Sequence, residues 1–231
     1  MSKFSLIVAL LFASATWSAV HAQVPGTLAG SLSVTTDYVF RGISQTQNDP
    51  AIQASVTWSV GNGFYAGLWG SNVDFTPGDK SDIEIDLSAG YAREVDGLTY
   101  DIGAIYYAYP DARSGLSYDY WEAALKLGRS FGDVTWSGGA YFTPDNFAGT
   151  DEGIYLTTGL KYAFADGFAI DANIGRSEID PAAGADYFDW NVGLTYSFPG
   201  VDAVVRFSDT DNAGCAKICD TRILVTLTHP F

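Results

Sequence analysis

Acidic side chains at every second position of several segments are the residues of this chain best suited to chemistry. They are Glu84, Asp86, Asp101, Glu122, Asp171, Asp189 and Asp202. Two facing carboxylates can act as a general acid and a general base in hydrolysis. Carboxylates scattered over many strands are instead typical of the polar interior of a membrane barrel, where they favour cations. We favour the second interpretation and keep a carboxylate-based membrane hydrolase as an alternative.

Histidine, the usual general base beside a nucleophile, is scarce. The chain has two histidines: His21 lies in the N-terminal leader, and His229 lies on the apolar face of the last candidate strand. A serine or cysteine nucleophile normally needs a histidine within hydrogen-bond reach. The sequence therefore predicts no Ser–His catalytic pair, no enzymatic activity and no organic cofactor.

The two cysteines, Cys215 and Cys219, form a C-x3-C pair in the last long connection. In an exported protein such a pair indicates a disulfide. A metal site would need further cysteine or histidine ligands, and these are missing. We expect a disulfide that stiffens the loop and no metal site.

Basic side chains share the predicted interior with the carboxylates. The predicted pore lining is Asp37, Arg41, Glu84, Asp86, Asp101, Glu122, Lys126, Lys161, Asp171, Asp189, Asp202, Arg206 and Arg222. Acids outnumber bases in this set, so a water-filled lumen would prefer cations. The alternative is an interior filled by ion pairs, which gives a narrow, salt-bridged structural or surface-interaction barrel with little conductance.

Twelve segments with period-two alternation must position these side chains. We predict strands at 28–40, 49–60, 63–75, 81–94, 98–109, 117–130, 132–143, 151–164, 167–177, 186–198, 201–209 and 220–231. Tight Gly- and Asp-containing connections at 61–63, 95–97, 131–133, 165–167 and 199–200 alternate with longer polar ones. An up-and-down antiparallel barrel of the outer-membrane type predicts this order, with short periplasmic turns and longer external loops.

One face of these strands is apolar and the other is polar. Ile83, Ile85 and Leu87, for example, alternate with Glu84 and Asp86. A lipocalin-like soluble barrel would put its apolar face inside, whereas a membrane barrel puts it outside. Aromatic residues near both strand ends predict two interfacial belts. The predicted belt near the long loops is Tyr38, Phe40, Phe75, Tyr106, Tyr109, Trp121, Phe142, Tyr187 and Phe188.

The last strand ends the chain on Phe231, with His229 at a position where an aromatic residue is usual in outer-membrane barrels. No following element can cover the edge of this strand, so we expect it to pair with the first strand and close the barrel. A terminal aromatic residue is also the signal that the barrel assembly machinery reads. The sequence therefore predicts that machinery and outer-membrane lipid as partners.

The N-terminal residues 1–22 predict an export signal. Lys3 precedes an apolar run, and small residues end at Ala22, where we expect cleavage. The remainder, 23–231, is predicted to be a single barrel domain in the outer membrane of a Gram-negative cell. No later run reaches the ~18 apolar residues of a transmembrane helix. The formal charge of −15 argues against nucleic acid as a partner.

The first strand and loop closely resemble the opening of the TorF family of porin-like proteobacterial proteins. The matching stretches are SVTTDYVFRGISQT at 33–46, NDPAIQ at 48–53, GFYAGLWGSNVDF at 63–75, EIDL at 84–87, GY at 90–91 and YYAYP at 106–110. The resemblance implies an outer-membrane barrel with pore activity. From the polar, net acidic interior we expect passive diffusion of small hydrophilic solutes, with a preference for cations. Asp37 and Arg41, four residues apart at the predicted external rim, would have a structural role as a rim salt bridge.

Overall fold

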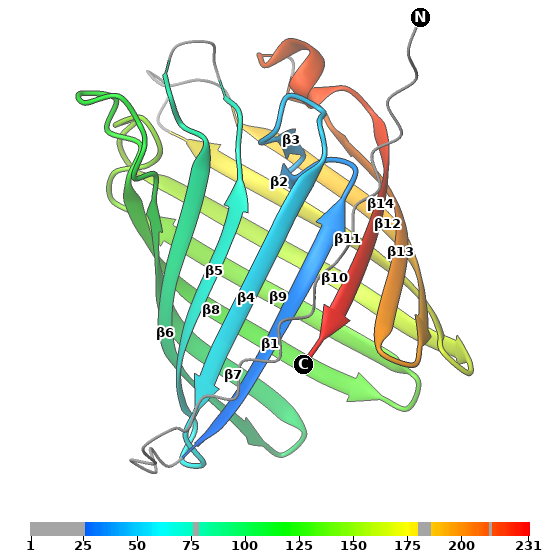
Figure 1. Ribbon diagram of the computed structural model, residues 1–231. Helices are drawn as coiled ribbons and strands as arrows, with labels where there is room; N and C mark the ends of the chain where they lie inside the picture. Colours follow the sequence, from blue (N-terminus) through cyan, green and yellow to red (C-terminus); the bar gives the residue numbers. More distant parts are fainter. Residues whose placement is uncertain (1–25, 76–78, 180–185, 213) are drawn as a thin grey trace, which may run out of the picture.

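The alternating residues form twelve antiparallel strands that close into one barrel (Figure 1). The structure is a computed structural model that describes residues 26–75, 79–179, 186–212 and 214–231. The predicted export signal, 1–22, lies outside these residues. The barrel strands are β1 (Thr27–Thr35), β4 (Ala51–Ser59), β5 (Phe64–Asn72), β6 (Ile83–Val95), β7 (Leu98–Ala108), β8 (Tyr120–Phe131), β9 (Val134–Thr143), β10 (Gly153–Ala165), β11 (Phe168–Ile179), β12 (Tyr187–Phe198), β13 (Val201–Thr210) and β14 (Arg222–Pro230). The predicted twelve-stranded up-and-down barrel is confirmed.

Each barrel strand pairs with its sequence neighbour, and β14 returns to β1. In that closing pair Val34 lies opposite Leu227, and Thr35 lies opposite Thr226. Backbone bonds extend the pairing to the chain end: Phe231 N donates to Gly30 O at 2.9 Å, and Gly30 N donates to Phe231 O at 2.8 Å. The expected pairing of the last strand with the first is confirmed, so neither strand is left as an open edge.

Apolar side chains face outward and polar ones face inward along the strands. Leu87 is 53% exposed and Ile102 is 62% exposed, whereas Glu84 and Glu122 are 2% and 1% exposed. This is the reverse of a soluble ligand-carrying barrel and matches an outer surface solvated by lipid. The described part of the chain contains no helix long and apolar enough to cross a membrane.

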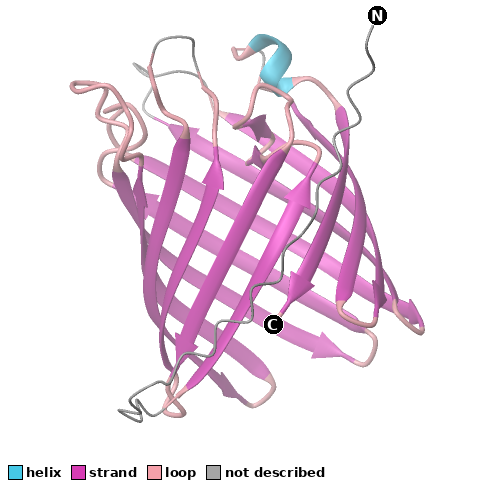
Figure 2. Cartoon of the chain, viewed as in Figure 1, coloured by secondary structure: helices cyan, strands magenta, loops and turns pink. Residues whose placement is uncertain are grey.

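The connections divide the barrel into a short-turn end and a long-loop end (Figure 2). At the short-turn end, for example, Asp96 and Gly97 have φ of 53° and 75°, which is the positive-φ pair of a type I′ hairpin. The long-loop end carries the 3-10 helix η1 (Ala216–Cys219) and two further short strands, β2 (Val39–Phe40) and β3 (Ile43–Ser44).

The prediction of one external aromatic belt at the long-loop end is partly wrong. Tyr106, Trp121, Phe142 and Phe188 are exposed on the outside. Tyr38, Phe40, Phe75, Tyr109 and Tyr187 are instead buried or packed against the interior core around Tyr107 and Tyr120. They lie inside because several belong to loops that fold over the mouth, where strand alternation no longer sets their direction.

The predicted first strand, 28–40, also ends earlier than expected. β1 stops at Thr35, and the following residues leave the barrel wall instead of extending it. Thr35 Oγ1 donates to Asp37 O at 3.0 Å, a local side-chain bond that competes with the ladder at this point. The segment freed in this way forms the centre of the candidate site.

Candidate functional site

Residues 36–48, which we call the inward hairpin, turn from β1 into the barrel. Within them Val39 pairs with Ser44, and Phe40 pairs with Ile43. The two turn residues, Arg41 and Gly42, have φ of 48° and 81°, as a two-residue type I′ hairpin requires. Glycine adopts this conformation freely, whereas it costs a residue such as arginine about 1–3 kcal/mol. Contacts around Arg41 must therefore hold it in place.

Asp37 fixes the base of the inward hairpin. Its Oδ1 accepts hydrogen bonds from Ser44 Oγ at 2.6 Å and from Thr46 Oγ1 at 2.9 Å. Its Oδ2 pairs with Arg222 Nη1 on β14 at 2.8 Å. Both side chains of this ion pair are at least nine-tenths buried. Asp37 thus ties both arms of the hairpin to the strand that closes the barrel.

Arg41 fixes the tip of the hairpin to the far wall. Its Nη2 lies 2.7 Å from Glu122 Oε2 on β8, and Tyr107 donates a hydrogen bond to the same oxygen at 3.0 Å. The guanidinium carbon also lies over the rings of Tyr155 and Phe40, at 4.2 and 4.7 Å from their centroids, within the range of cation–π attraction. Burial alone would lower the pKa of Arg41, but the charge and hydrogen bond of Glu122 outweigh it and raise that pKa. Arg41 therefore stays charged.

The inward hairpin crosses the lumen. It begins at β1, and its tip contacts β8 and β10, which stand about halfway round the barrel from β1 in the closed order of strands. Figure 1 shows β2 and β3 inside the mouth of the barrel, behind β4. The hairpin therefore narrows the passage at the level of Arg41.

Gly42 lets the hairpin approach strands β12 and β13 closely, and we expect Gly42→Val to dislodge it. A Cβ at this position would lie 2.8 Å from Thr210 Cβ and 2.9 Å from Asp189 Cβ. Limited digestion with trypsin, followed by mass spectrometry, should show cleavage after Arg41 in the variant and little in the wild type.

Gly97→Val is the matched control for this variant. Gly97 has a similar φ of +75°, but a Cβ there would meet nothing within 4 Å. The control thus carries the backbone strain without the clash and should leave Arg41 protected. Equal protection of Arg41 in both variants would show that the close approach at Gly42 does not hold the hairpin.

Three interior carboxylates have an oxygen without a partner. Glu84 accepts a hydrogen bond from Tyr38 at 3.3 Å and Asp189 accepts one from Tyr155 at 3.2 Å. Within the described residues, Glu84 Oε2, Asp86 Oδ1 and Asp189 Oδ2 have no hydrogen-bond partner. Glu84 and Asp86 lie two residues apart on β6, and Asp189 lies on β12, across the barrel.

Ion pairs line the barrel below the hairpin, toward the short-turn end. Asp101 Oδ2 lies 2.8 Å from Lys126 Nζ, and this pair lines a second cavity of about 410 Å³. Asp171 forms a two-pronged pair with Arg206 at 2.7 and 3.0 Å, and Arg206 also donates to Asn191. Such pairs stiffen the wall and neutralise most of its charge.

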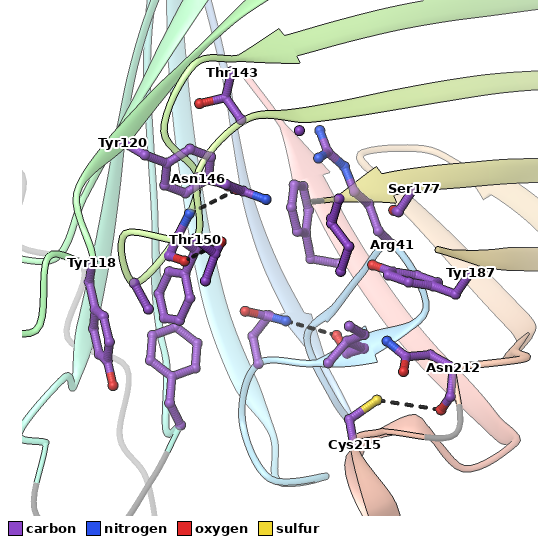
Figure 3. Close-up of a pocket in the computed structure, with 18 of the residues that line it drawn as sticks. Arg41, Tyr118, Tyr120, Thr143, Asn146, Thr150, Ser177, Tyr187, Asn212 and Cys215 are labelled. Atoms are coloured by element: carbon purple, nitrogen blue, oxygen red, sulfur yellow. Dashed lines mark hydrogen bonds between the residues drawn. The ribbon is translucent and has the colours of Figure 1, made fainter. Parts of the chain in front are cut away.

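A cavity of about 420 Å³ lies above the hairpin at the long-loop end. We call it the vestibule (Figure 3). Its aromatic lining is Phe40, Phe75, Tyr109, Tyr118, Tyr120, Phe147 and Tyr187, and its polar lining includes Gln45, Thr143, Asn146, Thr150, Ser177 and Asn212. Arg41 and Glu122 lie at its floor, where the hairpin begins the constriction.

The thirteen residues predicted to line a pore lie mostly around the constriction and the lower lumen. Four pairs of them meet: Arg41 with Glu122, Lys126 with Asp101, Arg206 with Asp171, and Arg222 with Asp37. Lys161 and Asp202 lie near the short-turn end and have no ion pair within the described residues. The expected salt bridge between Asp37 and Arg41 is wrong, because the tight turn at Arg41 carries its side chain away from Asp37.

Tyrosines around Arg41 are the site residues that sequence reasoning missed. They are Tyr107, Tyr120, Tyr141 and Tyr155, which stack, donate hydrogen bonds or lie beside the guanidinium. The alternation of side chains along the strand could have identified them. Tyr120, for example, stands two residues before Glu122 and therefore points to the same inward face. None of the four belongs to the predicted aromatic belt, and the predicted pore lining contains charged residues only, so neither prediction includes them.

Cys215 and Cys219 form a disulfide with their Cα atoms 5.6 Å apart, at the two ends of the turn that contains η1. Arg222 donates from Nη2 to Lys217 O at 3.3 Å, which connects this loop to the Asp37 pair. The described residues contain no group of three or more His, Cys, Asp or Glu side chains arranged to hold a metal ion.

Comparison with known proteins gives a family and a set of structural relatives. A family model described as "Bacterial protein of unknown function (Gcw_chp)" matches residues 19–231. No curated protein matches the chain. Among solved structures, the KdgM porin is similar with a TM-score of 0.62 and 12% identity, over 88% of this chain and 99% of that one.

Two further structures give the same result. The NanC porin has a TM-score of 0.57 and 10% identity, over 88% of this chain and 98% of its own. A KdgM porin in complex with disordered oligogalacturonate has a TM-score of 0.58 and 13% identity, over 88% of this chain and 98% of that one. At these identities the likeness establishes a shared barrel fold.

Proposed function

Because the chain belongs to the Gcw_chp family and has the fold of outer-membrane porins, we propose that it is a porin. Small hydrophilic solutes diffuse passively through its lumen, with a preference for cations. The inward hairpin sets the width of the passage. No reaction is catalysed, and no cofactor takes part.

The observation that carries this proposal is the excess of carboxyl groups over basic side chains in the interior. Arg41, Lys126, Arg206 and Arg222 each form an ion pair with a carboxylate. Glu84, Asp86 and Asp189 have no such pair within the described residues, and each keeps one oxygen without a hydrogen-bond partner. When ionised, these carboxyl groups attract cations and repel anions.

The environment of the barrel follows from its outer surface. The apolar strand positions face hydrocarbon, and the exposed aromatics at the short-turn end, such as Phe64 and Phe131, mark an interface. We place the barrel domain, 23–231, in the outer membrane of a Gram-negative cell after cleavage near Ala22. The short-turn end faces the periplasm, and the long loops face outward.

Two further features support the same assignment. The resemblance to the TorF family implies pore activity, and we propose the barrel assembly machinery as a partner of the closing strand β14 and the adjacent Phe231. Phe231 is 71% exposed, so the terminal ring is accessible as well as paired through its backbone.

Conductance of the mature protein in a planar lipid bilayer tests the proposal. The protein is refolded in detergent and inserted into the bilayer under a KCl gradient. We expect discrete current steps and a reversal potential whose sign shows that K⁺ is more permeant than Cl⁻. A reversal potential of the opposite sign would contradict the assigned charge of the lumen.

The alternative function is a narrow structural barrel. The observation that favours it is the inward hairpin, which crosses the lumen and is fixed at both ends by buried ion pairs. A folded barrel that inserts but carries no current would support this alternative, and the long loops would then be the place to look for a binding partner.

A further inference from the structure

We infer that the vestibule is a binding site for a neutral sugar. This inference rests on the proposed function and names its substrate class, since a sugar held in the vestibule stands directly above the constriction. The vestibule volume of about 420 Å³ is within the range of small-molecule sites, about 300–1,000 Å³.

The vestibule has aromatic and polar side chains on both sides. Figure 3 shows Tyr118, Tyr120 and Asn146 on one side, with Arg41, Ser177, Tyr187 and Asn212 on the other. We call the side with Tyr118 the aromatic wall, because a cluster of rings lies there. Around Tyr118, the rings of Phe75, Tyr109 and Phe147 contact one another with centroid distances from 4.3 to 6.1 Å. A pyranose ring suits such a mixed lining, because its C–H face is apolar and its hydroxyl edge is polar.

Amide donors stand on both sides of the vestibule. Asn146 Oδ1 accepts a hydrogen bond from Phe147 N at 2.8 Å, and Asn212 Oδ1 accepts one from Gly214 N at 3.0 Å. These bonds fix each amide in its own loop. Neither Nδ2 group donates a hydrogen bond within the part of the chain that the structure describes, so both are available to sugar hydroxyls.

Charge selects a neutral ligand. The charged residues of the lining are Arg41, Glu122 and Glu178. Arg41 pairs with Glu122 at 2.7 Å, and Glu178 pairs with Arg176 at 2.9 Å. Among the described residues of the lining, no unpaired cation is therefore left to bind the carboxylate of an acidic sugar. The formal charge of −15 also disfavours the approach of anions.

Saturation-transfer NMR on the refolded mature barrel tests this inference. The barrel is held in a detergent without a sugar head group, and maltose is the neutral probe. We expect transfer to the ring C–H protons of maltose. Galacturonic acid at the same concentration should show little transfer.

Two variants locate the site. Tyr118→Ala removes a ring of the aromatic wall, and Asn212→Ala removes an amide donor from the other wall. Each should weaken maltose binding by about tenfold, with the far-UV circular dichroism of the barrel unchanged. Asn62→Ala, in an exposed tight turn at the short-turn end, is the control and should bind like the wild type.

Absence of transfer to maltose, or equal transfer in the Tyr118, Asn212 and Asn62 variants, would overturn the inference. Stronger binding of galacturonic acid than of maltose would overturn its neutral character. Because the NMR measurement needs no current, it is separate from the bilayer test. A barrel that binds maltose but carries no current would contradict the porin proposal and leave the sugar site supported. A barrel that conducts but does not bind maltose would contradict the sugar site and leave the porin proposal supported.

Discussion

The Arg41→Ala variant should conduct several times more current per channel than the wild type. Arg41 occupies the lumen with its own side chain, and it is also the residue that fixes the hairpin tip to Glu122 on β8. Without it the tip loses an ion pair and the contacts of the guanidinium over three aromatic rings, Phe40, Tyr141 and Tyr155. The positive φ of 48° then has little to maintain it. Single-channel recording in a planar bilayer measures the change.

The control for this prediction is Arg129→Ala. Arg129 is also on β8, but it is exposed on the outward face near the short-turn end, where its guanidinium lies over Phe131 at 5.4 Å. This variant loses the same charge and leaves the lumen unchanged. Equal conductance of the Arg41 and Arg129 variants would show that the hairpin does not set the width of the passage.

Loss of Arg41 should also destabilise the barrel, since Glu122 is then buried without its counter-charge. Breaking a buried pair by removing one partner typically costs about 3–5 kcal/mol. The double variant Arg41→Ala/Glu122→Gln removes that charge and should recover much of the stability. It should keep the raised conductance, which separates widening of the lumen from general loosening of the fold.

Neutralising Glu84 and Asp86 together should reduce the cation preference, with Asp189 retaining part of it. In Glu84→Gln/Asp86→Asn two carboxylates with unpartnered oxygens become amides of nearly the same shape. Of the other acids near the constriction, Glu122 and Asp37 are paired with Arg41 and Arg222, which leaves Asp189 as the acid without an ion pair. The reversal potential in a KCl gradient should therefore move toward zero, while current steps persist.

Glu94→Gln/Asp96→Asn is the matched control for this double variant. It removes the same two charges at the same spacing, but beside an exposed tight turn at the short-turn end. Its reversal potential should stay close to that of the wild type. Asp101 is left unchanged in both variants because it pairs with Lys126, and its loss would release a positive charge into the lumen. An unchanged reversal potential in the Glu84 and Asp86 variant would refute their role in selectivity.

The similarity to solved porins does not predict the selectivity of this chain. The KdgM and NanC porins share the barrel of this chain at 10–13% identity, which transmits the architecture and no particular residue of the lumen. Selectivity must therefore be measured on this chain. The inward hairpin, the vestibule and the unpaired carboxylates are its own features to test.

The alternation of apolar and polar residues, together with the turn residues, was sufficient to predict the barrel. Ile83, Glu84, Ile85 and Asp86 alternate, and because successive side chains of a strand point to opposite faces, the alternation alone separates an outer from an inner surface. The Gly-containing turns set the hairpins, and an uncovered last strand required a partner. These signals lie within a few residues of one another, so the twelve strands and their closure could be predicted without tertiary contacts.

The constriction depended on contacts that no local pattern encodes. Arg41 meets Glu122 across 81 positions of the sequence, and Asp37 meets Arg222 across 185. The alternation along the strands predicted that these side chains point inward. It did not predict which of several oppositely charged side chains each would pair with. The choice among them follows from the turn at Arg41 and Gly42 and from the close packing of Gly42 against β12 and β13. The sequence thus determined a barrel with a polar, net acidic interior, and only the tertiary structure decided that its first loop folds inward and divides that interior in two.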